Sequence, residues 1–197
     1  IMRWRNNRTG MTANNLLERL RHLLNPIEDS DAGAAVAVLL RKGERGDLQL
    51  FLVKRATNPR DPWSGNMALP GGRRYSEDRD IKGTVIRETQ EETGIDLSDC
   101  CFLGTLDAVS STRAVTRLVV LPFVVVCEER PKVTLNKELV DCFWFPISQL
   151  KPSEGKALME GHEVPAFLVN GEIVWGLTYR MLKNLLELLE KAATSTS

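Results

Sequence analysis

Three glutamates, Glu88, Glu91 and Glu92, stand at spacings of three and four residues, shortly before a glycine. Residues at those spacings share one face of an α-helix, so the pattern places three carboxylates side by side. Apolar residues recur with the same period on the other side of the segment. The sequence therefore predicts a helix over 80–93 that has one acidic face and ends at Gly94, a typical C-terminal cap.

The crowded carboxylates repel one another, and a divalent cation would remove that penalty. Oxygen ligands suit a hard cation such as Mg²⁺ or Mn²⁺. Ahead of the helix, Gly71 and Gly72 let the backbone pass close to a metal or phosphate, and the Gly72 carbonyl is a further candidate ligand. Arg87 adjoins the cluster and is placed to orient one carboxylate. A solvated acidic face is the alternative, but PGG, Arg-Glu, Glu-Glu and Thr-Gly in one ordered window favour a metal site.

The rest of the 197-residue chain predicts one mixed α/β domain without internal repeats. Two amphipathic helices are expected, Thr12–Asn25 and Leu177–Lys191, together with a Glu163–Trp175 hairpin that turns at Asn170-Gly171. The expected strands are Ala34–Leu40, Leu48–Arg55, Met67–Leu69, Phe102–Ala108, Arg117–Val126 and Cys142–Pro146, with a polar loop at Ser110–Thr116. This divides the chain into an N-terminal extension at 1–31, the domain at 32–192 and a disordered tail that begins at residue 193.

Composition excludes several classes of function. Lys+Arg 26 against Asp+Glu 26 gives a formal net charge of zero, which argues against binding nucleic acid or a membrane by bulk charge. No apolar run approaches the roughly 20 residues that span a bilayer, and the basic N-terminus lacks the apolar core of a secretory signal. We therefore expect a cytoplasmic location. The four cysteines show no zinc spacing, and three lie in apolar runs, where we interpret them as reduced core residues.

The glycine–helix–glycine window resembles the Nudix box. The matching positions are Gly72, Arg87, Glu88, Glu91, Glu92, Gly94 and Ile95. Compared with the usual box, this chain has one more residue between the glycine and the Arg-Glu pair, which makes Asp78, beside Glu77, the first acidic position. Thr89 stands where an apolar residue is usual. The resemblance implies a Nudix-type α/β/α sandwich with a mixed sheet and an added N-terminal helix. It also implies a metal-dependent hydrolase that cleaves a diphosphate linkage in a small nucleotide-derived substrate.

The additional residue is similar to the coenzyme A diphosphatase branch of that family. PWSGNMALPGGR, NKELVDCFWFPISQL and VWGLTYRML resemble further segments of the branch, so the similarity covers most of 34–189. Two features depart from it: Arg60 stands one residue farther from Gly65, and LVKRATNP replaces a threonine-rich stretch. The expected substrate is coenzyme A or a derivative. ADP-ribose, a dinucleotide, a nucleotide sugar or a (d)NTP are alternatives, and a catalytically silent nucleotide-binding module is a rival from another class.

The resemblance also implies roles for single residues. Metal ions held by the glutamates would offset charge on the diphosphate while a water attacks one phosphorus. Glu88 is one candidate for the carboxylate that takes the proton, and Glu138, on a later loop, is the other. Four arginines are candidate phosphate ligands, namely Arg55, Arg60, Arg73 and Arg113. SSTRAVTR, at 110–117, is a possible substrate contact, and Trp63 and Trp175 are either core residues or base-stacking platforms. The two leucine-bearing helices would suit a homodimer.

Overall fold

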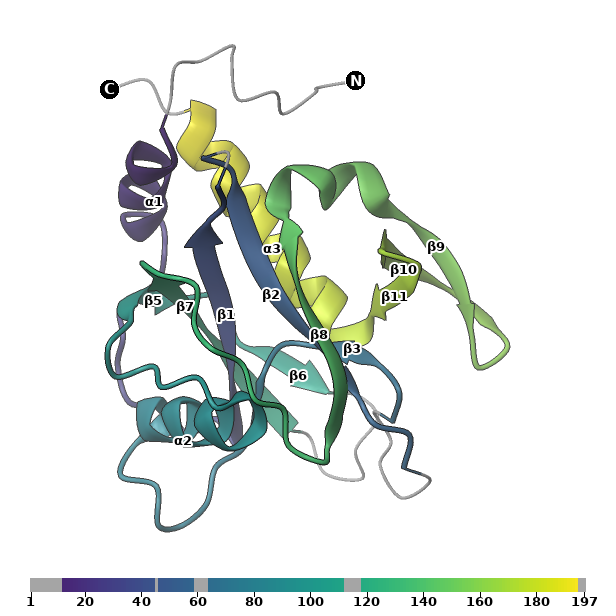
Figure 1. Ribbon diagram of the computed structural model, residues 1–197, viewed down its shortest axis with the longest axis horizontal. Helices are drawn as coiled ribbons and strands as arrows, with labels where there is room; N and C mark the ends of the chain where they lie inside the picture. Colours follow the sequence, from purple (N-terminus) through teal and green to yellow (C-terminus); the bar gives the residue numbers. More distant parts are fainter. Residues whose placement is uncertain (1–11, 45, 59–63, 112–117, 195–197) are drawn as a thin grey trace.

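The computed structural model describes residues 12–44, 46–58, 64–111 and 118–194. Their strands form two sheets, one of eight strands and one of three (Figure 1). The larger sheet has the order β3-β2-β1-β7-β5, with β4, β6 and β8 paired to β1, β7 and β2. Its strands are β1 (Ala34–Lys42), β2 (Leu48–Arg55), β3 (Met67–Ala68), β4 (Gly71–Arg73), β5 (Cys101–Thr105), β6 (Val109–Ser111), β7 (Leu118–Cys127) and β8 (Leu139–Pro146). Because β1 and β7 pair in parallel and the other pairs are antiparallel, the sheet is mixed, as predicted.

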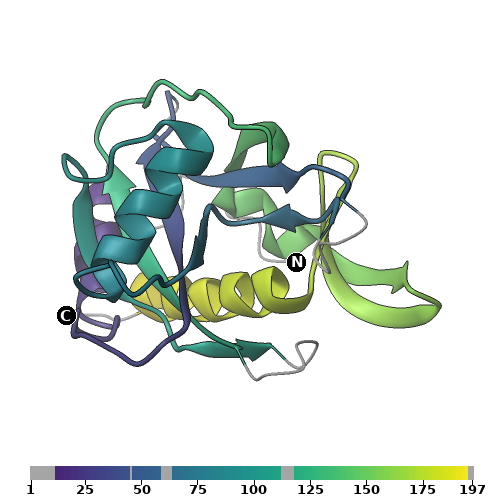
Figure 2. The same cartoon turned by 90° about the horizontal axis from the view of Figure 1, so that it is seen from below.

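Helices cover both faces of the larger sheet, which confirms the α/β/α sandwich (Figure 2). Helix α2 (Ile81–Thr93) lies on one face, and α1 (Ala13–Arg21) and α3 (Gly176–Thr194) lie on the other. Strand β1 explains why both faces need cover, since six of its nine residues are buried. Alternate side chains of a strand point to opposite faces, so Leu39 packs on the α2 side while Leu40 packs on the α3 side.

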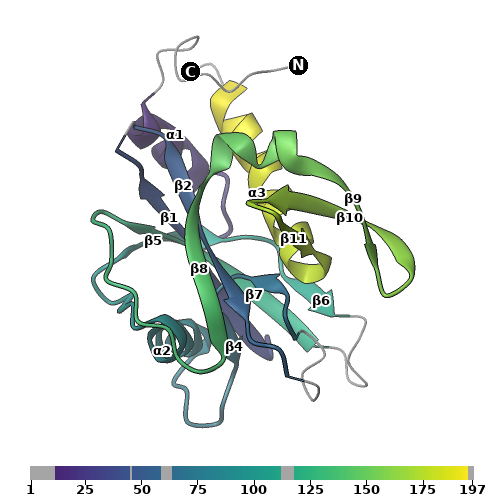
Figure 3. The same ribbon diagram turned by 45° about the vertical axis from the view of Figure 1, so that its right-hand side comes forward.

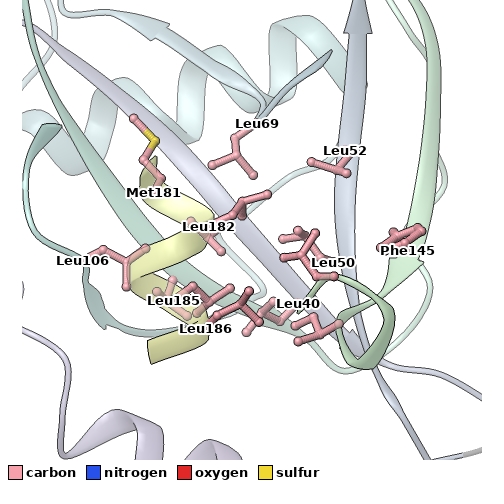
Figure 4. Packing of buried hydrophobic residues seen from close by; sticks show 14 of the residues in the cluster. Leu40, Leu50, Leu52, Leu69, Leu106, Phe145, Met181, Leu182, Leu185 and Leu186 are labelled. Carbon is pink, nitrogen blue, oxygen red and sulfur yellow. The ribbon is translucent and has the colours of Figure 1, made fainter. Parts of the chain in front are cut away.

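Helix α3 fills the second face with one stripe of apolar residues. Leu182, Leu185 and Leu186 pack beside Leu40 and Leu50 of the sheet (Figure 4). The buried leucines of α1 belong to the same cluster, and they are Leu17 and Leu20. Most leucines of both helices thus pack within this chain, which weakens the sequence argument for a dimer. The oligomeric state stays a prediction. No helix in the described ranges is long and apolar enough to cross a membrane.

The smaller sheet projects beside α3 (Figure 3). It consists of β9 (Glu154–Met159), β10 (His162–Val169) and β11 (Glu172–Trp175), and two 3-10 turns, Ile147–Gln149 and Lys151–Ser153, connect β8 to it. The predicted hairpin is confirmed: Asn170 and Gly171 both have positive φ, as its tight turn requires. The third strand, β9, was not predicted. None of its residues is buried, so its sequence lacks a clear period of apolar residues.

Several element boundaries differ from the predictions. Strand β4 occupies part of an expected loop, because Gly71–Arg73 pairs with β1. Strand β6 includes Ser110 and Ser111, which pair with β7 although the polar sequence predicted a loop from Ser110 onward. Helix α1 ends at Arg21 instead of Asn25. Helix α3 continues to Thr194, whose hydroxyl donates to the Glu190 carbonyl, so the expected disordered tail is wrong for its first two residues.

All four cysteines are free thiols. Cys127 is buried at the end of β7, and its Sγ lies 2.9 Å from that of Cys100. Burial raises the pKa of both thiols, which favours their protonated form. The interpretation as reduced residues fits this geometry, although Cys101 is exposed and lies outside the core.

Candidate active site

Helix α2 places the three glutamates at one end of the sheet. It starts where the Asp80 side chain accepts a hydrogen bond from the Gly83 N–H at 2.7 Å. It ends at Gly94, whose φ of 72° is the left-handed conformation expected for a C-terminal cap. The buried side chains of Ile81 and Val85 hold the helix against the sheet. The predicted helix, its cap and its two faces are therefore confirmed.

Arg87 lies at the centre of the acidic face. Its Nε and Nη2 donate to the two carboxylate oxygens of Asp78 at 2.8 and 2.9 Å. Its Nη1 donates to Glu88 at 2.7 Å and to Glu91 at 3.3 Å. The guanidinium also stacks on the ring of Tyr75, with 4.4 Å between Cζ and the ring centroid. This bidentate ion pair shows that Asp78, rather than Glu77, is the acidic partner of Arg87, and it orients the arginine toward the glutamates.

Asp78 itself is held from three sides. Besides Arg87, it accepts hydrogen bonds from the Tyr75 N–H at 2.8 Å and from the Thr84 hydroxyl at 2.9 Å. Its side chain is only 6% exposed. The hydrogen bonds from Arg87, above all, hold the pKa of Asp78 well below its usual range. Asp78 is therefore a permanent negative charge that fixes Arg87 in place.

Glu92 is the most deeply buried of the three glutamates, with 6% of its side chain exposed. One oxygen accepts the Gly71 N–H at 2.9 Å, and the other lies 3.7 Å from Nη1 of Arg55. Burial raises the pKa of Glu92 to about 7; the Gly71 N–H and Arg55 oppose the rise, while Glu88 and Glu138 add to it. Without a cation, this carboxylate is costly to ionise.

Glu88 lies directly over the backbone of β4. A Cβ at Gly72 would come within 2.3 Å of its Oε2, so any larger residue there would force the carboxylate to move. Burial raises the pKa of Glu88, and Arg87 opposes the rise. Glu91, 57% exposed, forms the outer rim of the acidic face. The glycine pair predicted to allow close approach thus accommodates a carboxylate.

The acidic face opens into a cavity of about 690 Å³. Its acidic lining is formed by Glu88, Glu91, Glu92 and Glu138. Its apolar lining includes Met67, Leu69, Leu118, Val120, Leu177 and Met181. The cavity therefore combines an acidic cluster with a mainly apolar wall.

The structure brings several predicted site residues to this cavity. Glu138, Arg55, Arg73, Gly72 and Trp175 all line it. The indole of Trp175 donates to the Asn66 side chain at 3.0 Å, a contact that holds the loop before β3 in place. Ser111 lines the cavity as well. Outside the described residues lie Arg60, Trp63, Arg113 and most of the SSTRAVTR segment.

Three further cavity residues were not identified from the sequence, namely Tyr75, Asn136 and Arg180. Arg180 donates to the Ser110 carbonyl at 3.0 Å and links α3 to β6. The Asn136 N–H donates to the carbonyl of Glu92 at 3.0 Å and so ties a distant loop to the end of α2. Such residues carry no local pattern, although the VWGLTYRML resemblance pointed to the segment that contains Arg180.

The carboxylates of the cavity fit a hard divalent cation. Glu88, Glu91, Glu92 and Glu138 offer only oxygen, and repulsion from neighbouring carboxylates, Glu138 among them, adds to the raised pKa values of Glu88 and Glu92. In the ranges that the structure describes, no three Asp, Glu, His or Cys side chains already converge on one point. Arg87 instead holds Glu88 and Glu91. A cation would therefore compete with Arg87 for these oxygens.

Comparison with known proteins places the chain in a family. Residues 31–162 match the model of the NUDIX domain. The chain therefore belongs to the Nudix hydrolase family, whose members act on phosphoric anhydrides. The resemblance inferred from the box is confirmed.

Curated relatives match at modest identity. The human mitochondrial coenzyme A diphosphatase NUDT8 is 28% identical over 165 residues, which cover 80% of this chain and 70% of that protein. An uncharacterized Nudix hydrolase, NudL, of Yersinia pestis is 30% identical over 157 residues, or 76% of each chain. An uncharacterized protein of Schizosaccharomyces pombe is 36% identical over 107 residues, 51% of this chain but 32% of that protein. The chain thus spans about a third of the length of some curated relatives.

Solved structures share the fold. The Nudix hydrolase RenU of M. smegmatis superposes with a TM-score of 0.58 at 18% identity, covering 84% of this chain and 89% of that one. The NUDIX domain of Shewanella oneidensis NrtR, solved with ADP ribose, has a TM-score of 0.55 at 18% identity, covering 85% and 91%. At such identities the likeness shows the fold alone.

Proposed function

We propose that this protein is a divalent-cation-dependent diphosphatase whose substrate is coenzyme A or a derivative. One observation carries the proposal: four carboxylates and many apolar side chains line the same cavity of about 690 Å³. Cleavage of a diphosphate needs cations beside its phosphate oxygens, and a cluster of carboxylates can hold such cations. The pantetheine arm of coenzyme A needs a long, mainly apolar space. The match to NUDT8, named a coenzyme A diphosphatase, supports this choice of substrate.

Glu88, Glu91, Glu92 and Glu138 would hold Mg²⁺ or Mn²⁺, with the Gly72 carbonyl as a further ligand. Such a cation offsets the charge that develops on the diphosphate oxygens. The arginines at the cavity, Arg55 and Arg73, would bind the phosphates. They are the last residues of β2 and β4.

The chain's own residues would handle the proton. A water oxygen forms a bond to one phosphorus, the anhydride bond to the bridging oxygen breaks, and the water's proton passes to a carboxylate. Glu88 is one candidate, because burial raises its pKa and thereby its affinity for a proton. Glu138 is the other. Asp78 and Arg87 act as positioning residues, because they reach the reaction only through Glu88 and Glu91.

The test is a substrate panel in which products are identified by mass. Coenzyme A, ADP-ribose, NADH, nucleotide sugars and (d)NTPs are each incubated with Mg²⁺, Mn²⁺ or EDTA. We expect coenzyme A to be cut to a nucleoside bisphosphate and phosphopantetheine faster than the other compounds, and only with a metal. A faster reaction with another panel member would reject coenzyme A and keep the diphosphatase. Loss of turnover on every compound would favour the catalytically silent binding module.

The cytoplasmic location and the lack of nucleic-acid and membrane partners stay predictions. Imaging of the tagged full-length protein and gel-shift or vesicle-flotation assays would test them.

A further inference from the structure

A second cavity, of about 680 Å³, lies on the α2 face of the sheet but away from the acidic site. The two cavities share no lining residue. Along β1, Val36 lines the first and Arg41 the second. Five residues of strand at about 3.3 Å each place them roughly 17 Å apart. The second cavity is therefore a separate feature at the opposite end of β1.

Every charged residue that lines this second cavity is basic: Arg41, Arg130 and Lys132. Arg130 and Lys132 are exposed and belong to the segment that follows β7. Arg130 lies close enough to influence two neighbours: after burial it helps to lower the pKa of Arg41, and it opposes the rise that burial causes in the pKa of Cys142. In the described ranges, no carboxylate lies within ion-pair distance of these three cations. Among the residues that the structure describes, three positive charges thus line one cavity with no carboxylate paired to them.

Arg41 is held rigidly in the wall. Its Nη2 donates to the Gln49 side chain at 2.6 Å, and its guanidinium lies over Trp144, with 4.7 Å between Cζ and the ring centroid. Its Nε is buried and has no hydrogen-bond acceptor in the described residues. Burial, followed by the nearby Arg130, lowers the pKa of Arg41. Glu44 and Asp47 attract it only from beyond ion-pair distance. An anion bound beside Arg41 would therefore satisfy its Nε and stabilise its charge.

We propose that this cavity binds a phosphate-bearing anion through Arg41, Arg130 and Lys132. A phosphate group carries close to two negative charges and several acceptor oxygens, which match the guanidinium of Arg41 in the wall and the two exposed cations Arg130 and Lys132. The ligand class is either an inorganic phosphate or the phosphate of a mononucleotide. This site is separate from the proposed substrate cavity, because the two share no lining residue.

The position of the site connects it to the acidic cavity. The segment that carries Arg130 and Lys132 continues to Thr134, whose N–H donates to the Thr93 carbonyl at the end of α2. It then reaches Glu138, whose carbonyl accepts the Ala56 N–H at 2.7 Å. An anion bound at the rim would hold the first part of the loop that presents Glu138 to the substrate cavity.

Isothermal titration calorimetry of the full chain tests the proposal. Pyrophosphate, inorganic phosphate and AMP are titrated separately in EDTA, so that metal-assisted phosphate binding at the acidic face is absent. We expect binding of at least one probe, and a loss of affinity of roughly tenfold or more in an Arg130→Ala/Lys132→Ala double variant. Both side chains are exposed, so this variant should fold. Arg41→Met, which keeps the apolar stem on Trp144, should lose affinity as well.

A Lys156→Ala/Lys191→Ala double variant is the matched control, because it removes the same charge from exposed positions elsewhere. It should bind as the unmodified chain does. Pyrophosphate binding as tightly as AMP would show that the phosphate group alone is recognised. Tighter binding of AMP than of either inorganic probe would identify a mononucleotide. Absence of binding, or equal affinity in all variants, would overturn the proposal.

Discussion

The buried carboxyl of Glu92 makes the stability of the metal-free protein depend on pH. Burial raises its pKa from 4.5 to about 7. A carboxyl with a raised pKa in the folded state binds its proton more tightly there than in the unfolded chain. Its contribution to stability is therefore complete below about pH 4.5 and is lost as the pH rises through about 7. We predict that substituting Glu92→Gln, which keeps the shape and removes the ionisation, abolishes this loss.

The magnitude follows from the two pKa values. The interval from 4.5 to about 7, at roughly 1.4 kcal/mol per pH unit, corresponds to about 3 kcal/mol in the free energy of unfolding. Because the side chain is 6% exposed, solvent screens little of this. The assay is urea unfolding in EDTA at about pH 5 and about pH 8.5. Between these pH values the free energy of unfolding should fall more in the unmodified chain than in Glu92→Gln, and the difference should be most of about 3 kcal/mol.

Glu91→Gln is the matched control, since it removes a charge from the same helix at a side chain that is 57% exposed. It should follow the pH dependence of the unmodified chain. Mg²⁺ or Mn²⁺ added at the higher pH should restore stability to the unmodified chain and not to Glu92→Gln. Equal losses in the unmodified chain and in Glu92→Gln would refute the argument that burial controls this carboxyl.

Three substitutions test other contacts of the site. Asp78→Asn should lower the free energy of unfolding by about 3 kcal/mol in urea, because the partly buried Arg87 loses its ionised partner. It should also lower kcat more than KM, and an unchanged kcat would show that Asp78 does not position the site. Gly72→Ala should lower kcat strongly, measured by product release, because its Cβ would meet the Glu88 carboxylate at 2.3 Å, and full activity would mean that Glu88 moves freely. Thr89→Val should raise the free energy of unfolding by about 1 kcal/mol, seen as a higher thermal midpoint, because it removes a buried hydroxyl that has no partner in the described residues. A lower thermal midpoint would reveal a hydrogen bond of that hydroxyl.

The acidic helix could be predicted from sequence because its signals are local. The carboxylates of Glu88, Glu91 and Glu92 fall at helical spacing, and Gly94 ends the helix where a left-handed residue is needed. The hairpin turn at 170–171 was predictable for the same reason. Each of these features depends on a few neighbouring residues, whatever the remaining chain does.

The parts that sequence did not predict depend on distant partners. Strand β4 exists because Gly71–Arg73 pairs with β1, some 35 residues earlier in the chain. Whether Asp78 or Glu77 binds Arg87 depends on how the loop before α2 turns, and Asn136 and Arg180 reach the cavity only through tertiary packing. The box resemblance supplied the fold and the reaction class, while the three cations of the second cavity come from segments too far apart for any motif.

The most direct test of the account is the rate of metal-dependent coenzyme A cleavage by Glu88→Gln, compared with Glu77→Gln. Both changes remove one carboxylate within the box, but Glu88 lies at the cavity beside Arg87, whereas Glu77 is exposed and bonds only to Ser76 in the described contacts. The account predicts that Glu88→Gln lowers kcat by roughly a hundredfold or more while Glu77→Gln retains nearly full activity. Comparable rates for the two variants would contradict the assignment of the acidic face as the catalytic site.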